Sequence, residues 1–143
     1  MGKVRNILQT KGNIIFFVSP DTIVYNALEI MFEKNVSALL VMENEIPVGI
    51  FTERDYARKV ILKNKSSKKT LIKEIMTDEL ISVTPDFTIE NAMQLMTTKF
   101  IRHLPVIEEN KIVGIISIGD VVKFHIEEQK FIIGSLENYI TGT

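Results

Sequence analysis

The stretch VGIFTERD at residues 48–55 returns as VGIISIGD at residues 113–120. Each copy places a glycine, two apolar residues, a small hydroxyl side chain and, three residues after the hydroxyl, an aspartate. Around these copies, residues 18–61 match residues 83–126 without a gap. The chain is therefore an internal duplication, and whatever one copy of the motif builds is expected to be built twice.

The apolar pattern within each copy predicts one order of elements. A stripe at helical spacing is followed by two short apolar runs joined by a polar turn, which is typical of a β-hairpin. A second helix is predicted from about Glu53 and from about Ile118, and a short strand at residues 14–18 or 80–83 comes first. The expected caps of the first helices are Asp21 and Asp86. We therefore predict an α+β fold of tandem, pseudo-twofold β-α-β-β-α repeats, each a small three-stranded sheet with two helices.

The duplication divides the chain into three parts. Residues 1–65 form the first repeat, residues 72–130 the second, and residues 131–143 a C-terminal helical tail. One half alone would expose much apolar surface, so we expect the two halves to pack face to face across a shared cleft. The tail is expected to pack on the core or on a partner subunit, because it carries an apolar stripe that includes Phe131, Ile132, Leu136 and Ile140.

Composition narrows the function classes. The chain has 143 residues, a formal net charge of −1 and no cysteine, which excludes disulfides, thiolate metal sites and a cysteine nucleophile. Its apolar runs are far shorter than the roughly 20 residues of a membrane helix, and its start is a poor secretory signal, so we expect a cytoplasmic protein away from membranes. Thr52 and Ser117 lack a histidine or lysine base at an obvious spacing, and neither histidine belongs to a metal-ligand cluster. We therefore expect neither an enzyme nor a metal site.

The repeated hydroxyl and aspartate allow two interpretations. In a capping box, the two side chains satisfy free amides at a helix start. Alternatively, a phosphate docks at the helix N-terminus beside the hydroxyl, while the carboxylate accepts hydrogen bonds from a ribose. Gly49 and Gly114 lie in the preceding strands, where glycine often marks the close approach of another backbone or of a ligand. One copy alone favours the cap, whereas two copies across one cleft favour a nucleotide site.

The paired motifs resemble a known family. The segments VSPD, NALEIM, VSALLV and VGIFTERD, followed by IMT, VTPD, NAMQLM, RHLPV and VGIISIGD, are similar to a pair of CBS domains, the module named after cystathionine β-synthase. The resemblance covers about residues 4–128 and extends to the stand-alone two-repeat CBS proteins of bacteria. It implies a regulatory sensor of adenosine-containing ligands, with AMP the first choice and ADP, ATP, NAD or S-adenosylmethionine as alternatives. It also implies a homodimer, an unidentified regulated protein and no catalytic cofactor.

The same resemblance implies two ligand sites. In the primary site, Asp120 would hold the ribose, Ser117 the phosphate, and Arg102 would reach the phosphate as well. Ile118 and Gly119 would lie beside the phosphate, and the residues enclosing the adenine would be Thr10, Ile15, Val36, Ser37 and Ala38. The second site repeats the arrangement with Thr52 and Asp55. Its other residues would be Arg54, Thr77, Ile81, Ile101, Arg102 and His103.

The two implied sites are not expected to be equal. Glu53 follows Thr52 directly and brings negative charge next to the phosphate position, although Arg54 can offset it. The corresponding neighbours of Ser117 are Ile118 and Gly119, which are neutral. We therefore expect the Ser117 and Asp120 site to bind a nucleotide more tightly.

Two other functions stay open at this point. The chain could be a ligand-independent dimeric interaction or scaffold protein that docks a partner through its C-terminal helix. Residues 54–73 are rich in lysine and arginine and could bind a nucleic acid. This second alternative is weaker because Tyr56 is the single aromatic residue there for base stacking.

Overall fold

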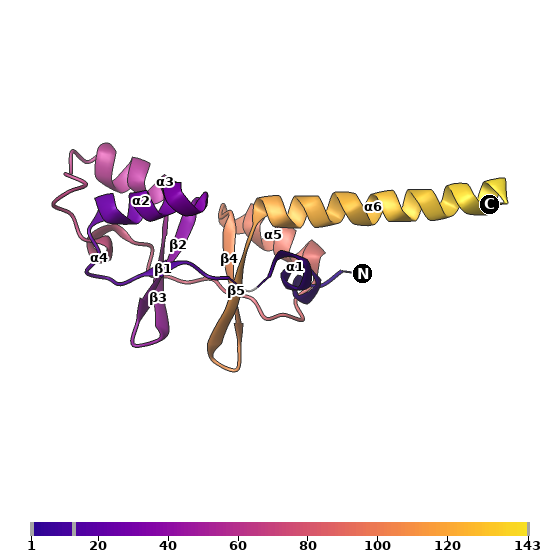
Figure 1. Cartoon of the computed structure of the whole chain (residues 1–143), viewed down its shortest axis with the longest axis horizontal. Coiled ribbons are helices and arrows are strands. Elements are labelled where there is room, and N and C mark those ends of the chain that lie inside the picture. The colour runs from indigo at the N-terminus through magenta and orange to yellow at the C-terminus, as the bar shows by residue number, and fades with distance from the viewer. Residues whose placement is uncertain (1, 13, 143) are drawn as a thin grey trace.

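The computed structural model of the chain describes residues 2–12 and 14–142. Two repeats lie side by side, each with a β-hairpin on one side and helices on the other, and the last helix projects away from the second repeat (Figure 1). The duplicated α+β fold predicted from the sequence is confirmed.

The first repeat is built on a three-stranded sheet. Strand β1 runs parallel to β2, and β2 pairs antiparallel with β3, so that Val18 lies opposite Val41 and Leu40 opposite Ile50. The elements of this repeat are β1 (Phe17–Val18), α2 (Val24–Lys34), β2 (Ala38–Glu43), β3 (Ile46–Thr52), α3 (Glu53–Tyr56) and the π-helix η1 (Ala57–Ile61).

The second repeat has the same order, but its sheet has two strands. Its elements are α5 (Ile89–Lys99), β4 (His103–Glu108), β5 (Lys111–Ser117) and α6 (Ile118–Thr141). The strand predicted at residues 80–83 is reduced to a single parallel bridge between Val83 and Val106. In the first repeat the Leu40 amide donates to the Phe16 carbonyl. Pro105 occupies the position equivalent to Leu40 and has no N–H, so this hydrogen bond is lost and the strand shortens.

The first helix of each repeat packs into the core of the other repeat. Helix α1 (Val4–Lys11) contributes Val4, Ile7 and Leu8 to a buried cluster with Leu104 and Ile116 of the second repeat. Helix α4 (Ile72–Ile75) of the second repeat likewise packs on the first repeat, and both of its terminal isoleucines lie in the buried cluster there. The boundaries of the two packed cores therefore differ from the boundaries of the sequence repeats.

The caps predicted at Asp21 and Asp86 are wrong. Helix α2 follows Ile23, and α5 follows Thr88, whose hydroxyl accepts a hydrogen bond from the Asn91 amide. The two aspartates instead form exposed ion pairs with the exchanged helices, between Asp86 and Arg5 of α1 at 2.9 Å and between Asp21 and Lys73 of α4 at 3.1 Å. Each aspartate lies two residues before the residue that precedes the helix, Ile23 or Thr88, and so cannot cap it.

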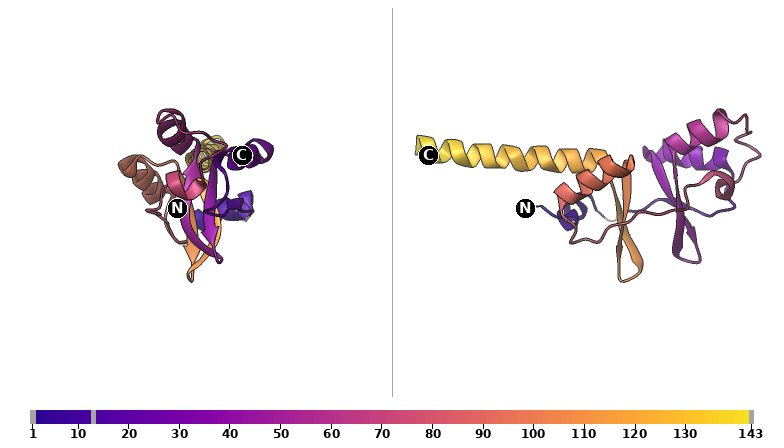
Figure 2. Two further views of the ribbon diagram at one scale, coloured as in Figure 1. Left: turned by 90° about the vertical axis from the view of Figure 1, so that its left-hand side faces the viewer. Right: turned by 180° about the vertical axis from the view of Figure 1, so that it is seen from behind.

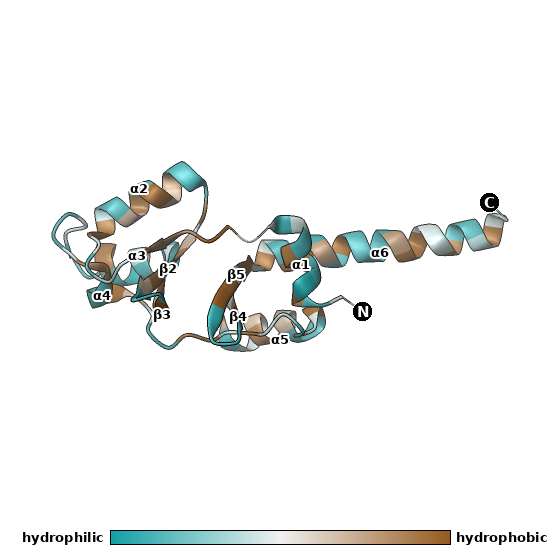
Figure 3. Ribbon diagram, turned by 60° about the horizontal axis from the view of Figure 1, so that its bottom comes forward, coloured by the Kyte–Doolittle hydropathy of each residue, from teal (hydrophilic) through white to brown (hydrophobic). Residues whose placement is uncertain are grey.

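Helix α6 begins on the second repeat and ends far from it. Its first turns pack through Val121, Ile118 and Phe124, whereas its C-terminal part projects from the body (Figure 1 and the right view of Figure 2). Apolar turns alternate with polar ones along the projecting part (Figure 3). The expectation that the tail packs on the core of its own chain is wrong, and packing on a partner subunit stays a prediction. Within the described part of the chain, no helix has the length and apolar character needed to cross a membrane.

Candidate functional site

Both copies of the repeated motif form a capping box. The Asp55 amide donates to Thr52 Oγ1 at 3.2 Å, and the Thr52 amide donates to Asp55 Oδ2 at 3.0 Å. Ser117 and Asp120 make the same pair of bonds, at 3.1 and 2.8 Å. The capping interpretation is therefore confirmed in both copies. A ligand at either site has to share a hydroxyl and a carboxylate that already hold a helix start.

The amide that opens each helix is also engaged. The Glu53 amide donates to the Ser37 carbonyl at 3.1 Å, and the Ile118 amide donates to the Arg102 carbonyl at 2.8 Å. These bonds tie the start of each second helix to the start of the hairpin. A phosphate at either site must therefore rely on side chains more than on this first amide.

One cavity opens between the two repeats, with a volume of about 610 Å³. It contains almost the whole second site predicted from the sequence, and Ile81 alone of that set is absent from its lining. The lining residues are Ser37, Ile50, Thr52, Glu53, Arg54, Asp55, Arg58, Lys59, Thr77, Phe100, Ile101, Arg102 and His103. The motif of the first repeat and the hairpin start of the second thus face one space, as the implied pseudo-twofold arrangement requires.

Four side chains that line the cavity were not among the site residues predicted from the sequence, namely Ile50, Arg58, Lys59 and Phe100. Arg58 and Lys59 follow Arg54 and Asp55 by one helical turn, and this spacing could have placed them on the same face. The π-helical turn at Ala57–Ile61 keeps both at the cavity. Phe100 had no such signal, because it ends α5 in the left-handed region with φ 55°.

The carboxylate of Asp55 is buried and fully engaged. Its Oδ1 lies 3.0 Å from Lys59 Nζ and accepts a hydrogen bond from Thr77 Oγ1 at 3.0 Å. Its Oδ2 accepts from the amide and the hydroxyl of Thr52. A ribose that binds Asp55 must therefore displace Lys59 or Thr77 from Oδ1.

Three guanidinium groups at this cavity have no carboxylate partner among the described residues. Arg54 Nη1 donates to the carbonyl of Phe100 at 2.6 Å and so links the two repeats. Arg58 and Arg102 form no ion pair within residues 2–12 and 14–142. Because Lys59 neutralises Asp55, the cavity has an excess of positive charge despite Glu53. Planar guanidinium groups in this position suit a phosphate.

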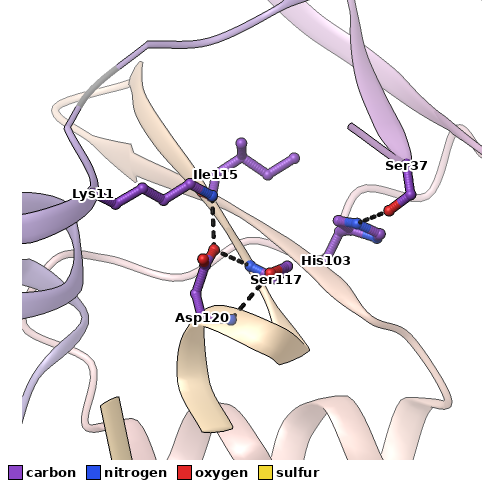
Figure 4. Close-up of polar contacts among 6 residues, drawn as sticks. All are labelled: Lys11, Ser37, His103, Ile115, Ser117 and Asp120. Atoms are coloured by element: carbon purple, nitrogen blue, oxygen red, sulfur yellow. Dashed lines mark hydrogen bonds and ion pairs between the residues drawn. The ribbon is translucent and has the colours of Figure 1, made fainter. Parts of the chain in front are cut away.

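The primary site predicted from the sequence is closed by a lysine of α1. Lys11 Nζ lies 2.7 Å from Asp120 Oδ2 and donates to the carbonyl of Ile115 at 2.9 Å (Figure 4). Burial would raise the pKa of Asp120, but the hydrogen bonds from Lys11 and Ser117 and the charge of Lys11 outweigh it and lower that pKa. Neither Ser117 nor Asp120 lines the cavity.

The other residues predicted for the primary site are dispersed. Ser37 and Arg102 line the cavity of the second site. The Thr10 hydroxyl donates to the Asn6 carbonyl of its own helix at 3.4 Å. Ile118 and Gly119 form the first turn of α6 beside Ser117, and Ala38 is buried in β2, whereas Ile15 and Val36 are half-buried. The structure therefore does not gather this set around one cavity.

His103 connects the two sites. Its Nε2 lies 3.0 Å from Ser37 Oγ, so the first residues of the two hairpins meet across the repeats (Figure 4). Burial lowers the pKa of His103, and the charges of Lys11 and Arg102 lower it further against the opposing charge of Asp120. His103 lines the cavity, and its lowered pKa favours the neutral imidazole. Among the described residues, no cluster of three histidine or acidic side chains could hold a metal ion.

Duplicated motifs, exchanged first helices and a cavity at the repeat interface define a tandem CBS module. The family model described as the CBS domain matches residues 4–62 and again residues 72–127. The chain therefore belongs to the CBS domain family, with two copies of the domain.

Relatives and solved structures extend this result. The chain is 40% identical over 148 residues to the mitochondrial CBS domain-containing protein CBSX3 of Arabidopsis thaliana, covering 97% of this chain and 72% of the relative. A putative signal-transduction protein with CBS domains from Burkholderia ambifaria superposes with a TM-score of 0.86 at 45% identity, over 89% of this chain and 96% of that one. The CBS domain pair of protein MJ0100, in complex with 5′-methylthioadenosine and S-adenosyl-L-methionine, has a TM-score of 0.76 at 25% identity, over 86% and 98% of the two chains.

Proposed function

We propose that this protein is a regulatory sensor that binds an adenosine-containing ligand between its two CBS repeats. AMP is our first choice, and ADP, ATP, NAD and S-adenosylmethionine are the alternatives. The observation that carries the proposal is the cavity of about 610 Å³ lined by both repeats, a volume in the usual range for small-ligand sites. The adenosine-type ligands of the MJ0100 pair support the same ligand class.

The residues of the cavity suit the parts of such a ligand. Asp55 is placed to accept the ribose hydroxyls when Lys59 turns toward the phosphate. Arg54, Arg58 and Arg102 supply donors for the phosphate. The apolar side chains of Ile50 and Ile101 are available to the base. We assign Thr52 to the phosphate, as its hydroxyl stands at the start of α3.

The Ser117 and Asp120 site, the primary site of the sequence analysis, is proposed as a further ligand site that opens when Lys11 leaves Asp120. Asp120 Oδ2 bonds to Lys11 and to the Ser117 amide, and the lysine occupies the place of a ribose donor. The order of affinity predicted from the sequence, with this site tighter, stays a prediction, but the Lys11–Asp120 ion pair argues against it, because the pair must break before a ligand binds. Its measurement is a titration that resolves the two sites.

The proposed output is a change in how the repeats pack. A ligand that contacts both repeats shifts their relative orientation only by its differential affinity for the two states, typically about 1 to 3 kcal/mol of coupling. We propose that a homodimer transmits this change to a regulated partner protein. We expect no catalysis, because the Thr52 hydroxyl donates to the capping Asp55 and has no histidine or lysine partner in the described part of the chain. A cytoplasmic location stays a prediction.

Calorimetric titration of the purified chain with AMP, ADP, ATP, NAD and S-adenosylmethionine tests the proposal. We expect binding of at least one of them, and the variant Asp55→Asn should weaken it strongly because an amide cannot replace a carboxylate that accepts two ribose hydroxyls. Asp21→Asn is the matched control, since that aspartate is exposed and paired with Lys73 away from the cavity. Absence of binding to all five ligands contradicts the proposal.

A ligand-independent interaction protein is the second candidate. The exposed apolar face of α6 favours it, because an interaction surface is the ordinary explanation for such a face. Native mass spectrometry of the purified protein separates the candidates, since a co-purified nucleotide supports the sensor. The nucleic-acid alternative loses support, because Arg54, Arg58 and Lys59 face the cavity.

A further inference from the structure

The C-terminal part of α6 is the largest feature that the nucleotide site does not explain. The second family match ends at residue 127, whereas the helix continues to Thr141 and projects from the body (Figures 1 and 2). Eight large apolar side chains between residues 122 and 140 are at least 43% exposed, namely Val122, Ile126, Phe131, Ile132, Ile133, Leu136, Tyr139 and Ile140. So much apolar exposure on one helix indicates a surface that is covered by a partner.

The spacing of these residues follows a heptad. Successive positions alternate between steps of four and three along one seam, which consists of Val122, Ile126, Gln129, Ile133, Leu136 and Ile140. In heptad terms, Ile126, Ile133 and Ile140 all fall at position a. Position d holds Val122, Gln129 and Leu136. A seam with a period of 3.5 residues is the pattern of a coiled coil, whereas a helix packed on a globular core follows 3.6.

We propose that residues 122–140 of α6 form a parallel two-stranded coiled coil with the same helix of a second copy of this chain. Among parallel coiled coils, isoleucine at position a with leucine at position d favours two strands, and Ile133 with Leu136 is such a pair. The inference does not depend on the proposed nucleotide function, because no residue of the seam lines the cavity.

Gln129 favours a parallel pair of helices, with a second copy of this chain as the partner. In a parallel pair in register, each layer of the seam meets itself, so Gln129 meets Gln129 and the two amides can hydrogen-bond to each other. In an antiparallel pair that keeps the apolar layers matched, Gln129 would lie against Ile133 with no polar partner. A second copy of the chain supplies the matching glutamine in the matching layer.

The size of the seam sets the strength of the interaction. Fewer than three heptads are available, and two such helices bury roughly 1,000 Å² in total, which is at the lower end of specific interfaces. We therefore expect a dimer that dissociates on dilution.

Sedimentation velocity of the full-length protein over a range of concentrations tests the proposal. We expect the wild type to pass from monomer to dimer, and Ile133→Lys to weaken the dimer by about tenfold or more because it puts a charge in the seam. The matched control is Phe131→Lys, which changes a similarly exposed apolar residue at position f, on the side away from the seam. A wild type that stays monomeric, or a dimer that tolerates Ile133→Lys as well as Phe131→Lys, overturns the proposal.

Cysteine cross-linking tests the orientation. The chain has no cysteine, so Ile133→Cys introduces the single thiol of the molecule. In a parallel pair, the two cysteines at position a face each other and we expect a disulfide-linked dimer under mild oxidation. Phe131→Cys is expected to stay uncross-linked. A stable dimer in which Ile133→Cys does not cross-link overturns the parallel arrangement.

Discussion

Lys11 Nζ lies 2.7 Å from Asp120 Oδ2, and this ion pair joins the end of the first helix to the first turn of the last. The equivalent aspartate of the first repeat, Asp55, takes its ammonium partner from its own helix, where Lys59 lies at 3.0 Å. Phe124 occupies the position of Lys59 in the second repeat. Both carboxylates of the duplicated motif are therefore neutralised, one locally and one by a helix exchanged from the other repeat. This difference makes the two sites unequal.

Removal of the Lys11 side-chain charge should open the Ser117 and Asp120 site. We expect Lys11→Met to raise the nucleotide stoichiometry from one to two per chain, because the carboxylate of Asp120 becomes free to accept a ribose. Folding stability should fall by about 1 kcal/mol at most, since the lysine is partly exposed. Calorimetric titration measures the stoichiometry, and Lys111→Met serves as the control at an exposed lysine of the second repeat. An unchanged stoichiometry in Lys11→Met would rule out the gating role of this ion pair.

Phe100 should be replaceable by asparagine with a gain in stability. It adopts φ 55°, and the equivalent residue of the first repeat, Asn35, adopts φ 54°. Bulky side chains rarely adopt this region, whereas asparagine does so readily, so Phe100→Asn should raise the free energy of unfolding by about 1 kcal/mol. Chemical denaturation measures it. Phe32→Asn in α2 is the control and should lower stability, since that exposed phenylalanine is helical.

The same Phe100 variant should bind the nucleotide less tightly, because the ring lines the cavity. A gain in stability together with a loss of affinity separates a role in binding from a role in folding. Unchanged affinity would show that the ring does not touch the ligand.

Gly49 should tolerate alanine less well than Gly114. A Cβ at Gly49 would lie 2.9 Å from the backbone carbonyl of Thr77 and 2.7 Å from Met76 Sδ, whereas a Cβ at Gly114 would meet Leu8 Cδ2 at 2.5 Å. The end of a leucine side chain can move aside, but the Thr77 backbone is held by two hydrogen bonds to Ile50. We expect Gly49→Ala to cost about 1 to 3 kcal/mol and Gly114→Ala less. Equal losses in thermal denaturation would contradict this ranking.

Protonation of His103 should destabilise the fold in mildly acidic solution. Burial and the charges of Lys11 and Arg102 lower its pKa below the ordinary value of 6.5. Below about pH 6.5 the unfolded chain therefore binds more protons than the folded chain, and stability falls as the pH falls toward the lowered pKa of the folded state. Above about pH 6.5 His103 is neutral in both states, and this loss of stability is absent. The free energy of unfolding at a series of pH values measures the slope, and His103→Gln should reduce it. A slope that His103→Gln leaves unchanged would assign the effect to other groups.

Much of the fold could be predicted because its signals are local. The hairpins follow from alternating apolar runs around a polar turn, and the starts of α3 and α6 follow from a hydroxyl and an aspartate three residues apart. The length of the strand predicted at residues 80–83 could not be predicted from local signals, because it depends on pairing with Pro105 in another strand. The helix caps at Asp21 and Asp86 failed because both helices begin later, after Ile23 and after Thr88, which itself caps α5.

The sequence by itself determined the duplication, the repeated capping motif, the family and most residues of the cavity. These features depend on residue types at fixed spacing, which a chain carries before it folds. Only the tertiary structure decided that α1 and α4 exchange places, that the cavity opens at Thr52 and Asp55, and that Lys11 covers Asp120. The physical reason is that these contacts join residues far apart in the chain, and burial of apolar helices in the opposite core sets which charges meet there. No local pattern around Asp120 contains the lysine that neutralises it.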